Sequence, residues 1–494
     1  MPEELYERSL ILAAEDCDPA TFGAIHRFSR NDARIISKLL AHGPVLLQGG
    51  RGSGKSALLI EASRRLFPQN GNATAVGIYL SLRHLPLLRS SGKDYEAIFC
   101  RRLIDRIQEV LGQIGLEFDA DPGVGSIQAA IAQLSSRLER RIVLMFDDAA
   151  HIGRETSLAE FFDIFRTLSS STVSCKAAIY PGVTQFGTRF DVYNDATVVD
   201  VTRNEDQQGF DQQFLEVIEA RFPKIKEFAP TATTLRFEEI AGFLGQSVLG
   251  NMRAFVFLCN AIMDSPEQSI GFNVLGQTLL QLTTNYYWPL LDEVSPKLGK
   301  YTPMVKPAEH IANALFQECG VSGRRFALVH REIISKLAKP FEILEYVGFI
   351  TRRDVSRALK SGGRGTRYAL SPCILLERLQ GKRLTSELFE RWRHDKDDPV
   401  EFHVKGSKLA GIGVPEPDST AELAILDEPI EKLRKSNAYP YGLTDHMITT
   451  LREAGKLTVK DLAETPDDQL DALPSIGPAK VKRIQNVVGQ AVWM

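Results

Sequence analysis

The sequence predicts an α/β fold, with a three-layer core over residues 1–228 and smaller, mostly helical units after it. Between residues 44 and 223, short apolar runs alternate with longer helical patterns, which is typical of a parallel sheet with crossover helices. A glycine-rich loop follows the first apolar run. The length of 494 residues corresponds to about three domains.

Each strand of the expected sheet is a short apolar run. The runs cover residues 45–47, 75–80, 142–146, 176–180 and 197–201. After the second run, Leu103, Ile107, Val110 and Ile114 recur at helical spacing, and another helix is expected over residues 127–138. From residue 229 the strand pattern stops, and apolar periodicity over 236–244 and 253–263 predicts a small helical unit.

The composition excludes several classes of protein. There are 59 lysines and arginines against 62 aspartates and glutamates, giving a net charge of -3, and 44% of the residues are hydrophobic. This balance excludes both a chain coated in positive charge and an acidic disordered chain. The six cysteines form no CxxC pair, and no apolar run is long enough for a membrane span. We therefore expect a soluble, cytoplasmic protein.

The strongest motif is GGRGSGKS, which satisfies the phosphate-binding pattern G-x-x-x-x-G-K-[ST] between an expected strand and an expected helix. Its glycines permit a tight turn whose N–H groups point at phosphate oxygens beside a helix N-terminus. Lys55 would reach the β- and γ-phosphates of ATP, and Ser56 would ligate Mg²⁺. The residues expected to bind the nucleotide are Gly49, Gly50, Arg51, Gly52, Ser53, Gly54, Lys55, Ser56 and Ala57. A chance glycine-rich turn is the alternative interpretation.

A pair of acids follows the third apolar run, in the segment IVLMFDDAAH. Ligands bind at the carboxyl ends of parallel strands, so Asp147 is expected to be the carboxylate on the magnesium side. Asp148 is placed to polarise the attacking water, a role that glutamate usually has in related ATPases. Because aspartate is one methylene shorter, hydrolysis could be slow or could give way to a nucleotide switch. The alternative is that the pair only caps a helix.

Over residues 20–375 the chain resembles AAA+ ATPases, especially the origin-recognition initiator ATPases. The segment GNMRAFVFLCNAI is similar to the sensor-2 helix of AAA+ lids, whose arginine reaches the γ-phosphate, and Arg253 matches that arginine. The resemblance also implies a sensor-1 residue and an arginine finger in a nucleotide-dependent homo-oligomer, for which Thr184 and Arg189 are the candidates. The alternatives are a surface arginine at 253 and ordinary loop residues at 184 and 189.

The segment HREIISKLAKPFEILEYVGFITRRDVSRALKSGGRGTRYALSP resembles a winged helix, which the origin-recognition initiators carry after their lid. Its expected second helix, over 340–347, holds two glutamates and no base, which is poor for reading bases in the major groove. The hairpin instead suits contacts with DNA phosphates. Its candidate DNA-binding residues are Arg352, Arg353, Arg357, Lys360, Arg364 and Arg367. A winged helix used for protein contacts is the alternative.

The C-terminal segment LPSIGPAK is similar to a helix-hairpin-helix, and with the preceding helix it resembles the C-terminal domain of the RNA polymerase alpha subunit. The resemblance implies that Gly477 lets backbone N–H groups approach a DNA phosphate, with Lys480 and Lys482 adding positive charge. Ser475 stands where that hairpin often has a second glycine. Domains of this type also bind proteins, which is the alternative.

These resemblances divide the chain into five segments. They are an AAA+ core over 1–228, a helical lid over 229–296, a winged-helix domain over 297–380, a linker over 381–430 and an all-α helix-hairpin-helix domain over 431–494.

Two functions fit this organisation. The first is a DNA-binding AAA+ ATPase that uses ATP and Mg²⁺, hydrolyses ATP slowly or under stimulation by double-stranded DNA, and recruits partner proteins in replication, in a mobile element or in defence against phage. The second is a STAND-type signalling switch, in which the core holds nucleotide and the C-terminal modules sense a protein effector or a ligand.

Overall fold

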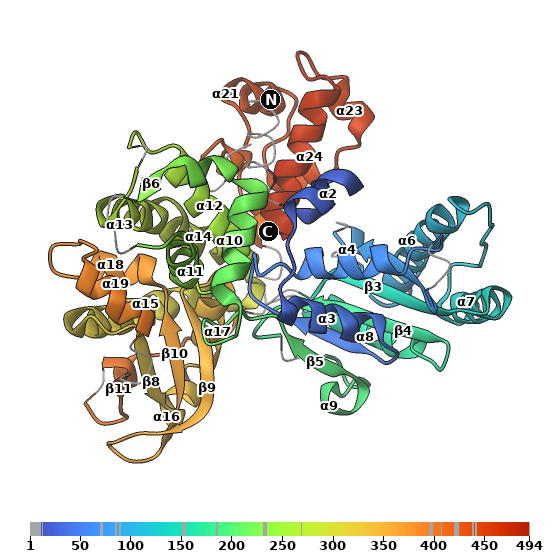
Figure 1. The fold of residues 1–494 in the computed structure, drawn as a ribbon. Helices are drawn as coiled ribbons and strands as arrows, with labels where there is room; N and C mark the ends of the chain where they lie inside the picture. Colours follow the sequence, from blue (N-terminus) through green and yellow to red (C-terminus); the bar gives the residue numbers. More distant parts are fainter. Residues whose placement is uncertain are drawn as a thin grey trace.

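A computed structural model describes the chain at residues 11, 13–69, 73–83, 86–87, 90–150, 155–183, 186–230, 235–267, 269–394, 399–406, 408–418, 424–436, 439 and 442–493. A five-stranded parallel sheet in the order β2-β3-β4-β1-β5 forms the centre of the core (Figure 1). Its strands are β1 (Val45–Gln48), β2 (Ala75–Ser81), β3 (Arg141–Ala150), β4 (Val173–Ile179) and β5 (Thr197–Asp200). All five expected strands are therefore present, and the predicted α/β fold class is confirmed.

Alternating strand residues bury the two faces of the sheet against different helices. Val45, Leu47 and Met145 pack with α3 (Arg30–Leu40) and α4 (Lys55–Arg65). Leu46 and Phe146 face the opposite way. The helices that cover this second face include α6 (Gly92–Gly112), α7 (Val124–Leu138) and α8 (Glu155–Leu168). The result is the expected three-layer core, and because the strands are parallel, the loops after β1 and β3 lie at the same sheet edge.

Helices follow the sheet, as expected from residue 229. They include α10 (Phe210–Arg221), α11 (Phe237–Ser247), α12 (Met252–Met263), α13 (Phe272–Leu282) and α14 (Trp288–Val294). Helix α12 begins at a capping asparagine, because the Asn251 side chain accepts a hydrogen bond from the Ala254 N–H at 3.1 Å.

A second sheet, in the order β11-β8-β10-β9, lies beyond these helices. Its region contains α15 (Val305–Ser322), β8 (Phe326–His330), α16 (Arg331–Lys336), α17 (Ala338–Val347), β9 (Ile350–Ala358), β10 (Arg364–Leu370) and α18 (Pro372–Arg378). This order contains the elements that a winged helix needs, with β9 and β10 as the hairpin. The winged-helix assignment itself stays a prediction.

The expected linker over 381–430 is wrong for much of its length. Residues in this range form α19 (Ser386–His394) and β11 (Val400–Phe402), which pairs in parallel with β8. In α19, Phe389 and Trp392 are only 2% and 1% exposed. The hydrophilic composition concealed this helix because two large aromatic side chains, three residues apart, are enough to anchor one face.

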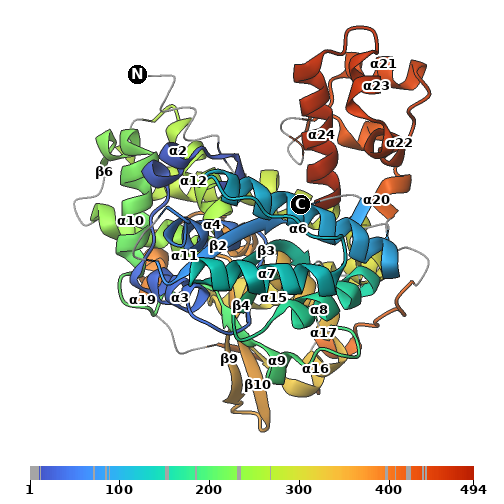
Figure 2. The ribbon, with the colours of Figure 1, turned by 90° about the vertical axis from the view of Figure 1, so that its right-hand side faces the viewer.

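The last helices form a unit with its own core. They are α20 (Ala424–Asp427), α21 (Asp445–Glu453), α22 (Val459–Glu464), α23 (Asp467–Asp471) and α24 (Pro478–Trp493). Their buried residues form a hydrophobic cluster of their own. It is separate from the cluster that contains the second face of the core sheet, the helices α11–α14 and the second sheet. We call this unit the terminal domain. Figures 1 and 2 place it and the β9–β10 hairpin at opposite ends of the molecule. Among the described helices, none is long and apolar enough to cross a membrane.

A buried ion-pair triad fastens the core to the second sheet. Glu205, which follows β5, accepts hydrogen bonds from Arg325 at 2.6 Å and from Arg353 on β9 at 2.5 Å. The three side chains are at most 4% exposed. Burial acts to raise the pKa of Glu205, but the two guanidinium groups prevail and lower it to about 2.

Removing the carboxylate of this triad should destabilise the fold, because two guanidinium groups would stay buried without a counterion. We expect Glu205→Gln to lower the free energy of unfolding by about 3–5 kcal/mol at neutral pH, measured by chemical denaturation, with the exposed Glu309→Gln as the control. The depressed pKa makes this stabilisation fully present above pH 4.5, and it is lost as the pH falls towards 2. A difference between the two proteins that persists at pH 2 would contradict this assignment.

Candidate nucleotide-binding site

The glycine-rich loop connects β1 to α4, as its motif requires. Gly52 and Gly54 adopt the left-handed conformation, with φ of 77° and 93°. A Cβ on Gly52 would lie 2.6 Å from the Asn251 side-chain oxygen and 2.8 Å from Cβ of Arg253. Within the described chain, no hydrogen bond occupies the backbone N–H groups of Gly52, Gly54, Lys55 or Ser56. The loop therefore presents unused donors at a helix N-terminus, and these residues line one pocket.

Lys55 is buried at the start of α4. Its ammonium group donates to the carbonyls of Gly49 and Gly50 at 2.7 and 3.0 Å and lies 3.9 Å above the Tyr180 ring. Burial lowers its pKa to about 8, despite the opposing attraction of Asp147 and Asp148. Among the described residues, the direct contacts of this buried cation are carbonyls and an aromatic face, which suits it to an anionic partner.

Asp147 and Ser56 line the same pocket. Its carboxylate accepts hydrogen bonds from the Tyr79 hydroxyl at 2.8 Å and from the Asp148 N–H at 2.9 Å. Burial and Glu15 raise its pKa, and a hydrogen bond with the Ser56 side chain acts in the opposite direction. A serine hydroxyl beside a carboxylate is a pair of hard oxygen ligands, which fits Mg²⁺.

Asp148 is held in an unusual backbone conformation, with φ of 52°. A non-glycine residue there carries strain of roughly 1–3 kcal/mol, which is common at functional sites. Its carboxylate forms an ion pair with Arg83 at 2.7 Å. Burial and Asp147 raise the pKa of Asp148 to about 6, while Arg83 and Lys55 act to lower it.

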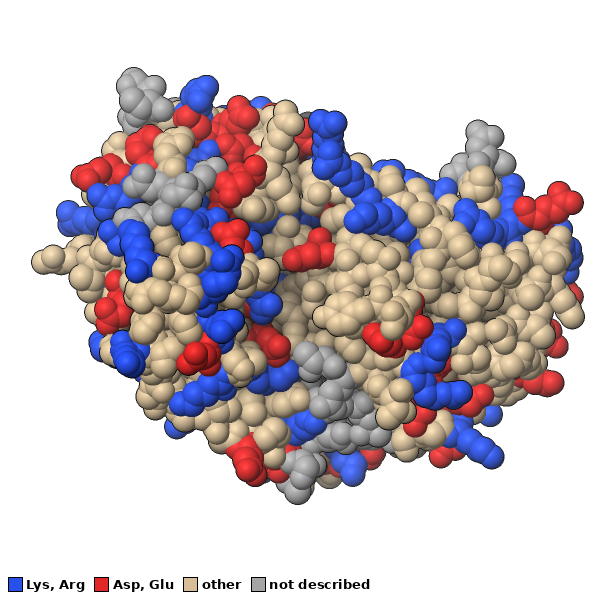
Figure 3. Space-filling model, turned by 90° about the horizontal axis from the view of Figure 1, so that it is seen from below, with Lys and Arg blue, Asp and Glu red and all other residues tan. Residues whose placement is uncertain are grey.

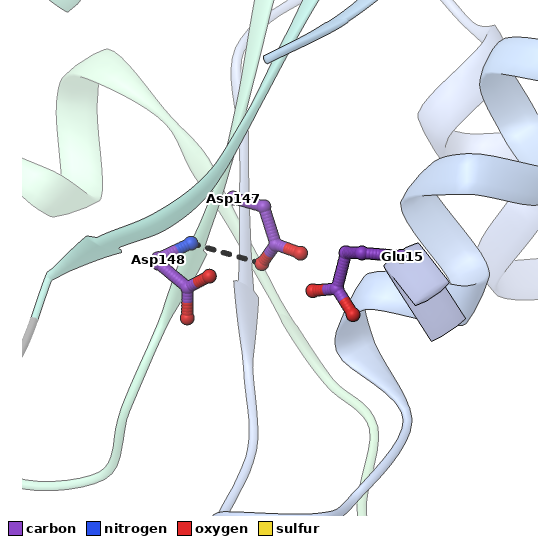
Figure 4. Close-up of side chains that lie close together, drawn as sticks. All are labelled: Glu15, Asp147 and Asp148. Carbon is purple, nitrogen blue, oxygen red and sulfur yellow. Dashed lines mark hydrogen bonds between the residues drawn. The ribbon is translucent and has the colours of Figure 1, made fainter. Parts of the chain in front are cut away.

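Sequence reasoning missed two residues at this edge of the sheet, Glu15 and Arg83. The carboxylate of Glu15 lies within 4.8 Å of those of Asp147 and Asp148, and Figure 4 shows the three converging. Arg83 lies between acids, 3.8 Å from Glu15. Its position just after β2 was a usable signal, because parallel strands end at one edge. The sequence around Glu15 has no comparable signal.

Helix α12 attaches directly to the loop. The backbone N–H groups of Met252 and Arg253 donate to the Gly52 carbonyl at 3.1 and 3.3 Å, and the Asn251 side chain donates to the Arg51 carbonyl at 2.6 Å. Arg253 lines the same pocket as Lys55, and within the described chain its guanidinium forms no ion pair. Burial and the neighbouring Arg51 lower its pKa. The structure thus brings the predicted sensor-2 arginine to the predicted phosphate loop.

Another missed contact supports the loop from the side of β5. Arg203 donates to the Ser53 carbonyl at 2.6 Å and to the Asp32 carboxylate at 3.0 Å. Asp32 is 1% exposed and also accepts from Gln213 at 2.6 Å. The lining of the pocket also includes the apolar residues Ile25, Phe28, Val217, Met252 and Val256. A pocket with both charged and apolar lining suits a nucleotide.

Two further candidates, Thr184 and Arg189, were expected from the AAA+ resemblance. Thr184 lies outside the described residues. Arg189 is at the surface, with 73% of its side chain exposed and Asp163 at 3.8 Å. A role for Arg189 towards a neighbouring subunit stays a prediction.

The six cations of the hairpin differ in environment. Arg353 is buried against Glu205, and Arg367 is paired with Asp354 at 2.6 Å and stacked on Phe326. Arg352 is paired with Glu345 at 2.8 Å, and Arg364 donates to the Ser356 hydroxyl at 2.7 Å. Arg357 lies 4.0 Å from Asp354, and Lys360 is exposed near the turn. The structure thus assigns Arg353 and Arg367 to packing.

The expected second helix of the winged-helix segment contacts the phosphate-binding loop. The carbonyl of Tyr346, near the end of α17, accepts a hydrogen bond from the Arg51 N–H at 3.1 Å. The Tyr346 ring meets the Tyr180 ring edge-on at 5.0 Å, and Lys339 donates to the Gly182 carbonyl at 2.8 Å. In this arrangement α17 packs on the core.

In the terminal domain, Ser475 has a φ of 61°, the conformation that glycine favours. Lys480 donates to the Ser475 carbonyl at 2.6 Å, Lys482 is exposed, and Gly477 precedes α24. No side chain lies within 4 Å of where a Cβ on Gly477 would be. The turn is therefore open at the point where the predicted phosphate contact would occur.

Comparisons with known proteins give similarities to solved structures only. No protein-family model and no curated protein matches the sequence. A Walker-type ATPase of Pyrococcus abyssi is 13% identical, with a TM-score of 0.43. The match covers 71% of this chain and 95% of that protein's chain. The ORC2 protein of Aeropyrum pernix matches with 10% identity, 75% of this chain, 96% of its own chain and a TM-score of 0.39. A STAND protein of Pyrococcus horikoshii with a tetratricopeptide repeat sensor matches with 13% identity, 74% of this chain, 44% of its own chain and a TM-score of 0.29.

The core has a P-loop α/β fold. This statement rests on the strand order and the loop geometry of the chain itself, because all three similarities are low. The matches include a protein from the origin-recognition group that the sequence resembles, and also one from the STAND class.

The depressed pKa of Lys55 makes binding of phosphates to the P-loop depend on pH. Because the anion needs the ammonium form, the affinity for a triphosphate should fall as the pH rises through 8, towards a limit of about tenfold per pH unit. Calorimetric titration with inorganic triphosphate on both sides of pH 8 measures this change. Lys55→Met should bind more weakly and without this dependence. An equal pH dependence in the variant would assign the effect to another group.

Proposed function

We propose that the chain is a magnesium-dependent ATPase whose nucleotide state controls engagement of DNA. The observation that carries the ATPase part is the meeting of Lys55, Ser56 and Asp147 around unused backbone donors in one pocket. The phosphates would lie on the P-loop, and adenine and ribose would lie against the apolar side chains that also line the pocket.

Each side chain then has a defined task. Backbone N–H groups from Gly52 to Ser56 and the ammonium group of Lys55 bind and orient phosphate oxygens. Ser56 and Asp147 would hold Mg²⁺, which, when bound, neutralises charge developing on the phosphates. Asp148 accepts a proton from the attacking water, and its pKa of about 6 leaves it mostly ionised at neutral pH. Arg253 contacts the γ-phosphate from α12 and so ties lid position to the state of the nucleotide.

DNA engagement is proposed for both ends of the molecule. At one end, Arg357, Lys360 and Arg364 belong to the hairpin and are at least partly exposed. Figure 3 looks onto this end and shows Lys and Arg side chains over the left half, with acids among them. At the other end, Gly477, Lys480 and Lys482 surround the open turn before α24. Contacts of this kind go to phosphates and imply little sequence preference.

A STAND-type nucleotide switch is the second candidate, and one contact favours it. The carbonyl of Tyr346 on α17 accepts a hydrogen bond from the P-loop N–H of Arg51. The region that contains α17 and the second sheet is thus attached directly to the P-loop. In such a switch the terminal domain would bind an effector protein or a ligand. Tightly co-purified ADP with negligible turnover and no shift of duplex DNA would favour this candidate.

The ATPase proposal predicts turnover that depends on the P-loop lysine. We expect Lys55→Ala to lose ATP hydrolysis because the phosphates lose their only P-loop ammonium group, and Asp148→Asn to lose hydrolysis while still binding ATP. Phosphate release, measured with and without duplex DNA at two salt concentrations, tests both variants. The exposed Lys93→Ala is the matched control. Normal hydrolysis by the Lys55 variant would refute the proposal.

The DNA proposal predicts a salt-dependent complex whose slope changes with the hairpin. Replacing Arg357, Lys360 and Arg364 with alanine should weaken duplex binding and reduce the slope of log affinity against log salt by about 0.9 for each DNA phosphate that is no longer neutralised. Fluorescence anisotropy with a labelled duplex measures this slope. The control carries alanine at the exposed cations Arg65, Lys93 and Arg101. An unchanged slope would exclude the hairpin as a phosphate-binding surface.

A further inference from the structure

The side chain of Arg51 has donors that the protein leaves unused. Arg51 is only 7% exposed and lines the nucleotide pocket. One guanidinium nitrogen lies 3.4 Å from the Glu293 carboxylate, whereas Nε and Nη1 are buried and have no hydrogen-bond partner among the described residues. Buried, unpaired donors on a cation are costly unless an anion completes them. Their place in the P-loop pocket makes phosphate oxygens the fitting partner.

Glu293 is shared between Arg51 and a second buried cation, Lys297. The Lys297 ammonium group lies 2.5 Å from the same carboxylate oxygen that faces Arg51. Burial acts to raise the pKa of Glu293, but Arg51 and Lys297 prevail and lower it, so the carboxylate stays ionised. One carboxylate oxygen thus balances two cations within the folded protein.

Lys297 also reaches the terminal domain. It donates to the Gln490 carbonyl on α24 at 3.3 Å, and its ammonium group lies 5.6 Å from the centre of the Tyr439 ring. Both α20 and α24 contact the short segment η4 (Ser295–Lys297) that carries this lysine. Because the terminal domain has its own hydrophobic core, its attachment depends heavily on such contacts.

We infer that the Arg51 side chain is a phosphate-binding group, and that Glu293 and Lys297 carry its engagement to the terminal domain. This inference rests on the proposed nucleotide binding and adds a route of regulation to it. The three side chains form what we call the Arg51 relay.

The direction of the effect follows from the charges. A bound triphosphate carries several negative charges and offers paired oxygens, so it competes with a single carboxylate for the Arg51 guanidinium. Once Arg51 turns to the phosphates, Glu293 retains only Lys297 as its counterion. The stronger pull on Lys297 weakens its bond to the Gln490 carbonyl, which is already long at 3.3 Å. Nucleotide binding therefore loosens the terminal domain.

Hydrogen exchange followed by mass spectrometry, on the full chain with and without Mg²⁺ and a non-hydrolysable ATP analogue, tests the inference. In the wild type, the analogue should speed exchange several-fold in peptides from the C-terminal half of α24. In Lys297→Met, exchange there should be fast in both states, because the anchor is gone. In Arg51→Met at saturating analogue, exchange should stay slow, and affinity for the analogue should fall by at least about tenfold.

Matched controls separate the relay from a general loss of charge. Asp292→Asn removes an exposed acid next to Glu293, and Lys306→Met removes an exposed lysine from α15. Both should respond to the analogue as the wild type does.

The possible failures are distinguishable. If the wild type binds the analogue but exchange in α24 does not change, or if Arg51→Met responds fully, the relay is refuted and the ATPase proposal stands. If the wild type binds no nucleotide, both the relay and the ATPase proposal are refuted. Should Arg51→Met not fold, Arg51→Lys is the second variant. It keeps the positive charge but replaces the planar guanidinium, which can donate to two phosphate oxygens at once, with a single ammonium group. A full affinity and a full response in Arg51→Lys would refute the phosphate contact.

Discussion

The pairing of buried charge around the P-loop is the constraint on which the rest of this structure depends. Lys55, Arg51 and Arg203 are each less than 8% exposed, and charges removed from water must find partners. Those partners come from distant parts of the chain, including Asp32 from α3 and Glu293 from α14. The loop is thus a junction that fixes how the core, the lid helices and the second sheet meet. Backbone bonds from α12 and to α17 strengthen the same junction.

This junction explains why nucleotide binding would have distant consequences without a large movement at the site. A phosphate group that takes up the unused N–H groups and the Arg51 guanidinium changes the partners of residues that already bind other modules. The Arg51 guanidinium then has two alternative partners, Glu293 in the protein and a phosphate in the ligand, so occupancy would shift a balance between two arrangements. Strain at Asp148, with its φ of 52°, belongs to the same site and shows that local backbone preference has yielded to the tertiary fold.

The sequence was informative wherever one short segment carries the signal. The strands of the sheet, the P-loop, Asp147 and the terminal helices each rest on local periodicity or on a motif, and the structure shows these elements where they were expected. Residues that matter only through tertiary contact could not be found in this way. Glu15 and Glu293 lie in ordinary segments, and their importance comes from which charge lies opposite them. The prediction of a linker over 381–430 failed for the same reason. In the sequence, Trp392 is one aromatic residue among charged ones, and only the structure shows that it is buried. The basic hairpin does include Arg353, but the buried partner of this arginine, Glu205, is 148 residues away.

Only the lysines and arginines at the surface are available to bind DNA, so they must be counted apart from the buried ones. The net charge of -3 averages over both kinds, and two buried arginines of the basic hairpin, Arg353 and Arg367, pair with acids of the protein itself. The candidate DNA-binding cations left at the surface lie on the hairpin and the terminal domain, which stand at opposite ends of the molecule (Figures 1 and 2). They do not form one continuous basic face. If both ends bind DNA, they hold separate stretches of duplex or a duplex bent around the protein, and bending DNA requires free energy from the contacts that it makes. A terminal domain that loosens when nucleotide binds would reduce this requirement, because a mobile module can follow the path of the DNA.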